Sequence, residues 1–312
     1  MPRLRTLLAL VAAAAVSAVA AAPAAAQETA PEAVAPTSFP VQTVTVRGAT
    51  LGYRDINPDA PGTPLVIING YGFTMAEWHP TFIMTLAQNR RIIMFDNRGI
   101  GRSSGSVRGL TIGSMAKDTA GLIRALRLGR PDVLGYSMGG YIAEELAIRF
   151  PKLVNRLVLA ASDPGSRHAI QPTKRVLDVL TNPNTTPTGL LPIMFPPNQQ
   201  AAGQAWLNAI AAQPNLTGAD FDTPAATMAA QERANGPLWY RHGAYARLGR
   251  ITAPTLVAHG TDDVIVPPGN ARILARRIRN AQRLTVPDAG HGFLFQDPAV
   301  RAQAVAAFLD RR

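Results

Sequence analysis

The chain has 312 residues, of which 47 % are hydrophobic, and this is enough to bury one large core. It contains no cysteine, which excludes disulfides, thiolate metal sites and a cysteine nucleophile. Its formal net charge is +11. The densest basic group follows one predicted helix without interleaved aromatic residues: Arg272, Arg276, Arg277, Arg279 and Arg283. We interpret it as a solvated helix face, with a polyanion-facing patch as the alternative, and expect no nucleic-acid partner.

The first residues are typical of a secretory signal peptide. "MPRLR" supplies a positive region, and "TLLALVAAAAVSAVA" is an apolar stretch too short to span a bilayer comfortably. "AAAQ" offers a small-residue cleavage site, so we predict a signal peptide over residues 1–26, with a retained anchor as the alternative. Residues 27–40 are rich in Ala and Pro and predict a disordered linker. We therefore expect an exported protein, periplasmic or secreted, with no stable membrane insertion after signal cleavage.

Short β-rich runs alternate with helical patterns along the rest of the chain. "VQTVTV" and "TLGYRDI" predict an antiparallel pair joined near Gly48. Brief apolar runs of the kind buried on both faces of a parallel sheet follow: "PLVIIN", "RIIMFD", "DVLGY", "RLVLAAS", "TLVAHG" and "RLTVPD". Helices are predicted between them, at about 75–89, 111–128, 138–150, 270–280 and 298–311. This alternation predicts the α/β class with a mostly parallel, doubly wound sheet, built from residues 41–165 and 247–312.

One stretch breaks the alternation, because residues 166–246 separate two strands where a simple connection would be far shorter. It is Pro-rich and carries several large apolar side chains: Met194, Phe195, Trp206, Phe221, Met228 and Trp239. We predict an inserted, mostly helical cap with an apolar underside, and a self-contained packing appendage is the alternative.

Two segments fit the pattern G-x-S-x-G, "GRSSG" at 101–105 and "GYSMG" at 135–139. The first leads into a polar, glycine-rich loop, so Ser103 and Ser104 have no helix N-terminus beside them. Ser137 follows a strand and opens a helical pattern, where a sharp turn exposes the hydroxyl and the helix N-terminus faces any oxyanion that forms. Ser137 is therefore the candidate nucleophile.

Five ordered segments resemble the α/β-hydrolase superfamily, and most closely its esterase, lactonase and haloperoxidase-like branch: "NGYG" (69–72), "DNRGIGRS" (96–103), "GYSMGG" (135–140), "HGTDDVIVP" (259–267) and "AGHG" (289–292). The resemblance covers about 41–165 and 247–312 and leaves the cap unmatched. It implies the α/β-hydrolase fold and a Ser-His-Asp triad. It says little about the substrate.

A base must take the proton of the serine hydroxyl, and His291 is the candidate among five histidines. It lies on a short loop after the last predicted strand, between Gly290 and Gly292, and the family's order Ser…Asp…His implies a base in this position. For the acid, "TLVAHGTDDVIVP" presents Asp262 and Asp263 just past a strand. The resemblance selects Asp263. Asp262 remains an alternative, and so does Asp163, because some relatives place the acid after the preceding strand.

The oxyanion hole is expected from backbone N–H groups. Met138 follows the nucleophile, and Tyr71 in "NGYG" matches the family's second donor. Relatives commonly have His where this chain has Asn69, a departure that concerns the loop's support more than the chemistry. The resemblance implies that Asp96 and Arg98 in "DNRGIGRS" brace a loop.

These residues predict a serine hydrolase that cleaves a moderately hydrophobic carboxylic ester or lactone through an acyl-enzyme. Alternatives on the same triad are cofactor-free haloperoxidase-like perhydrolysis, carbon–carbon bond hydrolysis and aminopeptidase action. A non-catalytic binding protein is expected to lack a triad member, yet all three candidates are present. "RGIGRSS" only approximates a dinucleotide-binding motif, since Ser104 replaces its third glycine. No cofactor and no metal are expected.

Overall fold

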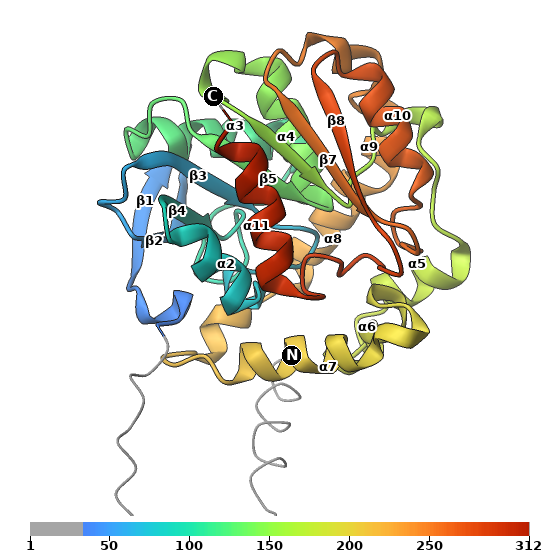
Figure 1. Cartoon of the computed structure of the whole chain (residues 1–312), viewed down its shortest axis with the longest axis horizontal. Helices are drawn as coiled ribbons and strands as arrows, with labels where there is room; N and C mark the ends of the chain where they lie inside the picture. Colours follow the sequence, from blue (N-terminus) through green and yellow to red (C-terminus); the bar gives the residue numbers. More distant parts are fainter. Residues whose placement is uncertain (1–33, 312) are drawn as a thin grey trace, which may run out of the picture.

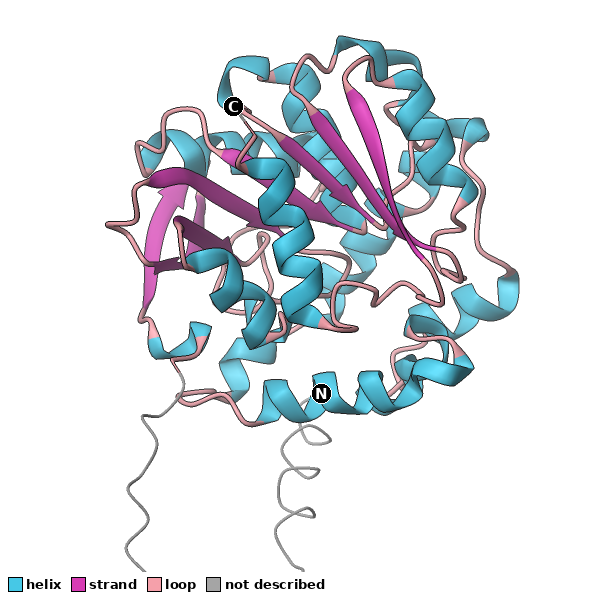
Figure 2. Cartoon of the chain, viewed as in Figure 1, coloured by secondary structure: helices cyan, strands magenta, loops and turns pink. Residues whose placement is uncertain are grey.

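In the computed structural model, which describes residues 34–311, eight strands form one twisted sheet with helices on both faces (Figures 1 and 2). The strands are β1 (Val41–Val46), β2 (Ala49–Ile56), β3 (Gly62–Ile68), β4 (Arg90–Phe95), β5 (Asp132–Tyr136), β6 (Leu157–Ala160), β7 (Thr255–Gly260) and β8 (Ala281–Val286). Their order is β1-β2-β4-β3-β5-β6-β7-β8. The pairs β1–β2 and β2–β4 are antiparallel and all other neighbours are parallel. The sequence predicts the first of these pairs and the mostly parallel character of the sheet.

Two apolar layers hold helices against the sheet. On one face lie α3 (Ile112–Ala125), α4 (Met138–Arg149) and α10 (Gly269–Arg277). On the other lie α2 (Pro80–Ala87) and α11 (Pro298–Leu309), which cross the front of the sheet in Figure 1. Because the central strands are covered on both faces, their side chains are buried almost without interruption.

Between β6 and β7 the chain forms helices and turns, with no strand among these residues. The longer helices are α5 (Lys174–Thr181), α6 (Pro187–Met194), α7 (Gln200–Ala211), α8 (Ala225–Asn235) and α9 (Pro237–His242). Trp206, Phe195 and Leu191 of this insertion join the apolar layer that contains α2 and α11. The insertion therefore covers one end of the sheet, as Figure 1 shows for α6 and α7.

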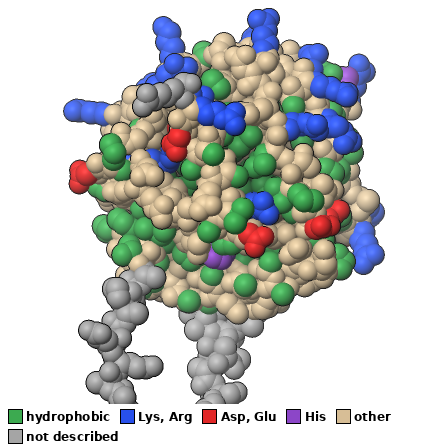
Figure 3. Space-filling model, viewed as in Figure 1, with side chains coloured by type: hydrophobic (Ala, Val, Ile, Leu, Met, Phe, Trp, Pro, Cys, Tyr) green, Lys and Arg blue, Asp and Glu red, His purple; other side chains and the backbone are tan. Residues whose placement is uncertain are grey.

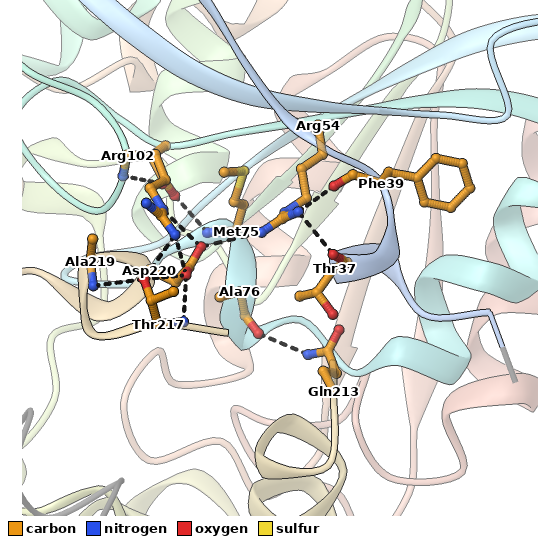
Figure 4. Close-up of polar contacts among 11 residues, drawn as sticks. Thr37, Phe39, Arg54, Met75, Ala76, Arg102, Gln213, Thr217, Ala219 and Asp220 are labelled. Carbon is orange, nitrogen blue, oxygen red and sulfur yellow. Dashed lines mark hydrogen bonds and ion pairs between the residues drawn. The ribbon is translucent and has the colours of Figure 1, made fainter. Parts of the chain in front are cut away.

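Asp220, in the 3-10 turn Gly218–Phe221 between α7 and α8, fastens the cap to the core (Figure 4). Its carboxylate accepts from Arg54 of β2 at 3.2 Å and from Arg102 at 2.6 Å. Arg54 is buried and also donates to the backbone carbonyls of Thr37 and Phe39. Two arginines thus converge on one cap carboxylate, and one of them, Arg54, also binds the start of the described chain.

Two predictions about local structure need correction. The expected linker over 27–40 is ordered and partly buried where the structure describes it, from residue 34: Pro36–Ser38 form a 3-10 turn, and Ala35, Pro36 and Thr37 are buried. Arg54 binds its carbonyls, which composition alone does not reveal. The helix expected at 75–89 is split, because Pro80 has no N–H and starts a new helix, α2, whose first turn is capped by His79. The expected signal peptide, residues 1–26, lies outside the described residues.

The basic residues on and after α10 lie at the surface of the molecule. The five arginines of the basic group on and after α10 are exposed, and Lys and Arg side chains project from the upper and right-hand margins of the face in Figure 3. From residue 34 to residue 311, no helix is long and apolar enough to cross a bilayer.

Candidate active site

Ser137 lies at the turn between β5 and α4. Its φ of 55° and ψ of −123° place a non-glycine residue in a strained conformation. The surroundings fix it there: its N–H donates to the carbonyl of Ala160 at 2.9 Å. A Cβ on Gly139 would lie 2.1 Å from the carbonyl oxygen of Ile68, so only glycine lets helix and strand approach this closely. The strain is held by packing, and Ser137 is left lining a cavity.

His291 and Asp263 form a buried pair on the loops that follow β8 and β7. Nδ1 of His291 lies 2.8 Å from Oδ2 of Asp263. The other carboxylate oxygen, Oδ1, accepts from the backbone N–H groups of Ile265 at 2.9 Å and Val266 at 2.8 Å. This arrangement favours the tautomer with the proton on Nδ1, which leaves Nε2 as the basic nitrogen.

A second imidazole supports the same carboxylate. Nε2 of His259 lies 3.2 Å from Oδ2 of Asp263 and 2.7 Å from the carbonyl oxygen of Val266. Burial alone would raise the pKa of Asp263, but the charge of His291 and the hydrogen bonds of both imidazoles hold it well below its usual range. Asp263 is therefore a fixed anion beside His291. His259 lies in the same sequence motif as Asp263, but nothing in the sequence indicates that its imidazole contacts the Asp263 carboxylate.

The loop of His291 is clamped from two sides. The hydroxyl of Tyr136, the last residue of β5, donates to the carbonyl oxygen of His291 at 3.0 Å, and their rings lie 5.1 Å apart. The N–H of Gly292 donates to the cap carbonyl of Met194 at 2.8 Å. A Cβ on Gly290 would lie 2.6 Å from that same oxygen. Because neither glycine has a side chain, the cap packs directly against this loop. The imidazole of His291 lines the same cavity as Ser137.

The loop after β3 brings Gly70 and Tyr71 to the same place. A Cβ on Gly70 would lie 3.2 Å from Cβ of Ser137, which shows how near this loop passes to the hydroxyl. Met138, the first residue of α4, has no acceptor for its N–H within the helix. Two backbone segments that could carry oxyanion donors therefore flank Ser137.

Asn69 supports this loop through both ends of its buried amide. Nδ2 donates to the carbonyl of Phe95 at 2.9 Å, and Oδ1 accepts from the indole N–H of Trp78 at 2.8 Å. The residue that departs from the family pattern thus ties the loop to β4 and to Trp78.

A cap residue that the sequence did not single out also holds the loop. Gly72 has a φ of 61° and donates its N–H to Oε1 of Gln231 in α8 at 2.9 Å. Gln231 is fully buried. It lies in a helix that mixes alanines with polar residues, so no local sequence signal distinguishes Gln231 from a surface residue.

The cavity joining these residues has a volume of about 550 Å³. Core and cap both contribute to its wall, which is mostly apolar and includes Phe73, Leu190, Trp206, Leu207, Tyr240 and Ile265. Its size and lining suit a small organic molecule whose reacting group reaches Ser137.

The alternative candidates lie elsewhere. Asp163 is buried and accepts from Tyr141, from the indole of Trp239 at 3.0 Å and from the N–H of Gly165 at 2.7 Å, so it ties α9 to the core. Asp262 is exposed. Ser103 is buried and bonds the backbone of Asp96 and Gly52, while Ser104 is exposed.

Asp96 and Arg98 make their contacts with other parts of the chain, and neither residue lines the cavity. Asp96 accepts from the N–H groups of Met75 and Arg102, both at 2.7 Å, and burial raises its pKa to about 7. Arg98 pairs with Asp118 at 2.8 Å. In the described part of the chain, no group of three or more His, Asp or Glu side chains could hold a metal ion.

Comparison with known proteins identifies the family. The family described as alpha/beta hydrolase fold matches residues 63–298. A poly(3-hydroxyalkanoate) depolymerase of Ectopseudomonas oleovorans is 33% identical over 264 residues, covering 81% of this chain and 86% of that protein. A putative non-heme bromoperoxidase, BpoC, of Mycobacterium tuberculosis is 32% identical over 268 residues, covering 83% of this chain and 97% of that protein.

A solved structure agrees with these matches. An alpha/beta hydrolase fold protein from Chitinophaga pinensis superimposes with a TM-score of 0.78 at 25% identity, covering 89% of this chain and 100% of the other. The sheet order, the turn at Ser137 and these matches lead to one conclusion: the chain belongs to the α/β-hydrolase fold family and is a hydrolase.

Proposed function

We propose that the protein is an exported serine hydrolase that cleaves a carboxylic ester or lactone. One observation carries the proposal: Ser137, in its strained turn, and His291, bound to Asp263, line the same mostly apolar cavity. The 33% identical relative named as a poly(3-hydroxyalkanoate) depolymerase adds support for ester chemistry.

The chemistry follows from these positions. His291 takes the proton of Ser137 as the hydroxyl oxygen attacks the carbonyl carbon, and Asp263 stabilises the resulting imidazolium. The N–H groups of Tyr71 and Met138 stabilise the oxyanion. His291 then returns the proton to the leaving alcohol, and an acyl-Ser137 ester forms. Water attacks that ester with His291 as base, which releases the acid and restores the serine.

Labelling and turnover test the proposal separately. A fluorophosphonate probe is expected to label the wild type and to leave Ser137→Ala unlabelled. Turnover is expected with 4-nitrophenyl esters or lactones in a panel that also holds vinylogous diketones, proline amides and a peroxide-dependent halogenation assay. Labelling that persists in Ser137→Ala overturns the nucleophile. Turnover confined to the amides, the diketones or halogenation replaces the ester assignment with that reaction.

Export is a separate part of the proposal and rests on the basic and apolar character of residues 1–26. Mass spectrometry of protein secreted by a bacterial host is expected to find a chain beginning near Gln27. A cell-retained chain that still carries Met1 contradicts export.

A further inference from the structure

The formal charges in the cavity wall are all negative. Among the described residues that line it, Glu77 and Glu232 carry carboxylates, and neither Lys nor Arg contributes. The chain as a whole has the opposite balance, with 31 Lys and Arg against 20 Asp and Glu. Its abundant arginines are used elsewhere: those on and after α10 are exposed, and Arg54 and Arg102 are bound to Asp220. Oε2 of Glu77 already accepts from the backbone N–H of Thr74 at 2.7 Å, so the charge bias of the wall rests on the carboxylate of Glu232 and on the lack of Lys and Arg among the described lining residues.

A substrate carboxylate would find no cationic partner in this wall. Burying an anion without a partner is costly, because apolar walls replace its water and nothing neutralises it. Phe73, Trp206, Leu207 and Ile210 are such walls. Aromatic faces and carboxylates instead favour a neutral or cationic group.

Glu232 lies where an incoming substrate meets the cavity. Three lining residues are exposed, Gln171, Glu232 and Pro237, and these mark the opening. Glu232 follows Gln231 in α8, and Gln231 holds the loop of Tyr71 through Gly72. Glu232 is thus an exposed residue of the cavity wall, on a helix that is fixed to the active-site loop.

We infer that the cavity selects esters or lactones whose acyl and alcohol parts are uncharged or cationic, that it rejects those with a free carboxylate near the scissile bond, and that Glu232 is a specificity-determining residue. This inference rests on the proposed ester hydrolysis. It separates this protein from α/β hydrolases that act on anionic substrates.

Four 4-nitrophenyl esters with one leaving group and matched chain length test the selection. Their acyl groups are hexanoyl, 6-methoxy-6-oxohexanoyl, 5-carboxypentanoyl and 5-(trimethylammonio)pentanoyl. The carboxylate ester is expected to have a kcat/KM at least about tenfold below that of its methyl ester, since its charge is unpaired in the cavity. The ammonium ester is expected to be turned over faster than the carboxylate ester.

Substitutions that change the charge at residue 232 test whether Glu232 causes the preference for the ammonium ester over the carboxylate ester. Glu232→Gln is expected to narrow the ratio of ammonium to carboxylate turnover by about threefold or more, and Glu232→Lys to narrow it further. Because Glu232 is exposed, added salt is expected to narrow the wild-type ratio as well. Asp59→Asn is the matched control: it removes one exposed carboxylate in the turn before β3, outside the cavity wall, and is expected to leave the ratio unchanged.

Two kinetic results and one binding result overturn the inference, and a further result overturns only the proposed function. Equal turnover of the carboxylate and methyl esters sinks the selection, and an Asp59→Asn effect as large as that of Glu232→Gln sinks the role of Glu232. If no ester is turned over, ester hydrolysis fails, and binding decides the selection. For this, monomethyl and dimethyl adipate are titrated into Ser137→Ala, and quenching of tryptophan fluorescence reports occupancy beside Trp206. Equal Kd values overturn the selection, and tighter binding of the diester supports it.

Discussion

The backbone N–H of Gly72 donates to the side-chain oxygen of Gln231 at 2.9 Å and so joins the loop after β3 to cap helix α8. Tyr71, the proposed oxyanion donor, immediately precedes Gly72. The cap therefore takes part in setting the position of an N–H group on the core. We therefore expect this cap helix to influence the geometry of the proposed oxyanion donor.

Gln231→Met tests this coupling, because it keeps the side-chain length and removes the acceptor. Without it, the loop shifts and the Tyr71 N–H loses alignment, so kcat is expected to fall about tenfold, with KM changed less. Gln213→Met is the matched control, since Gln213 is also a buried cap glutamine and donates to the core carbonyl of Ala76 at 3.1 Å. If both variants lost kcat by the same factor, the loss would follow from breaking any hydrogen bond between cap and core, and the specific coupling through Gly72 would be wrong.

Two buried aspartates are distinguished by their partners. Asp263→Asn removes the anion beside His291 and favours the wrong tautomer, so kcat is expected to fall about 10⁴-fold. Asp163→Asn disturbs the bonds to Tyr141 and Trp239, and is expected to lower the free energy of unfolding by about 1–3 kcal/mol with less than a tenfold change in kcat. Kinetics normalised to titrated active sites, together with urea unfolding, check both. Reversed effects would assign the acid to Asp163.

Asp220→Asn is expected to weaken the attachment of the cap. Both partners of the Arg54–Asp220 pair are buried, so removing the anion leaves a buried guanidinium uncompensated, and the free energy of unfolding is expected to fall by about 3 kcal/mol or more. Asp222→Asn, two residues away and exposed, is the control and is expected to change stability by less than about 0.5 kcal/mol. Urea unfolding measures both, and similar stabilities would exclude this pair as the fastening.

His79 links the stability of the fold to pH. Its Nδ1 accepts from the N–H of Thr81 at 3.2 Å, and burial lowers its pKa to about 4. Between pH 6.5 and 4 the unfolded chain binds a proton that the folded chain does not, so stability falls as pH falls. His79→Asn keeps a capping side chain without titrating. Its stability relative to wild type is expected to rise by about 2–3 kcal/mol from pH 7 to pH 4.5 in urea unfolding. A constant difference would contradict this.

The elements that local pattern determines were predictable, and those that depend on distant partners were not. Strand, sharp turn and helix around Ser137 follow from glycine spacing and apolar periodicity, and the sheet follows from its buried runs. Glu232 and Gln231 lie in a helix of polar composition, and only folding brings one to the cavity and the other to Gly72. Residues 35–39 have the composition of a linker, yet they pack because a buried arginine needs carbonyl partners.

Arg54 has one further consequence, for the order in which the molecule is completed. A ribosome delivers the chain from its first residue, so the guanidinium and the Thr37 carbonyl emerge long before Asp220 does. Until Asp220 has been made, Arg54 lacks the counter-ion that it has in the folded structure. Completion of this ion pair therefore requires a carboxylate that lies 166 residues further along the chain.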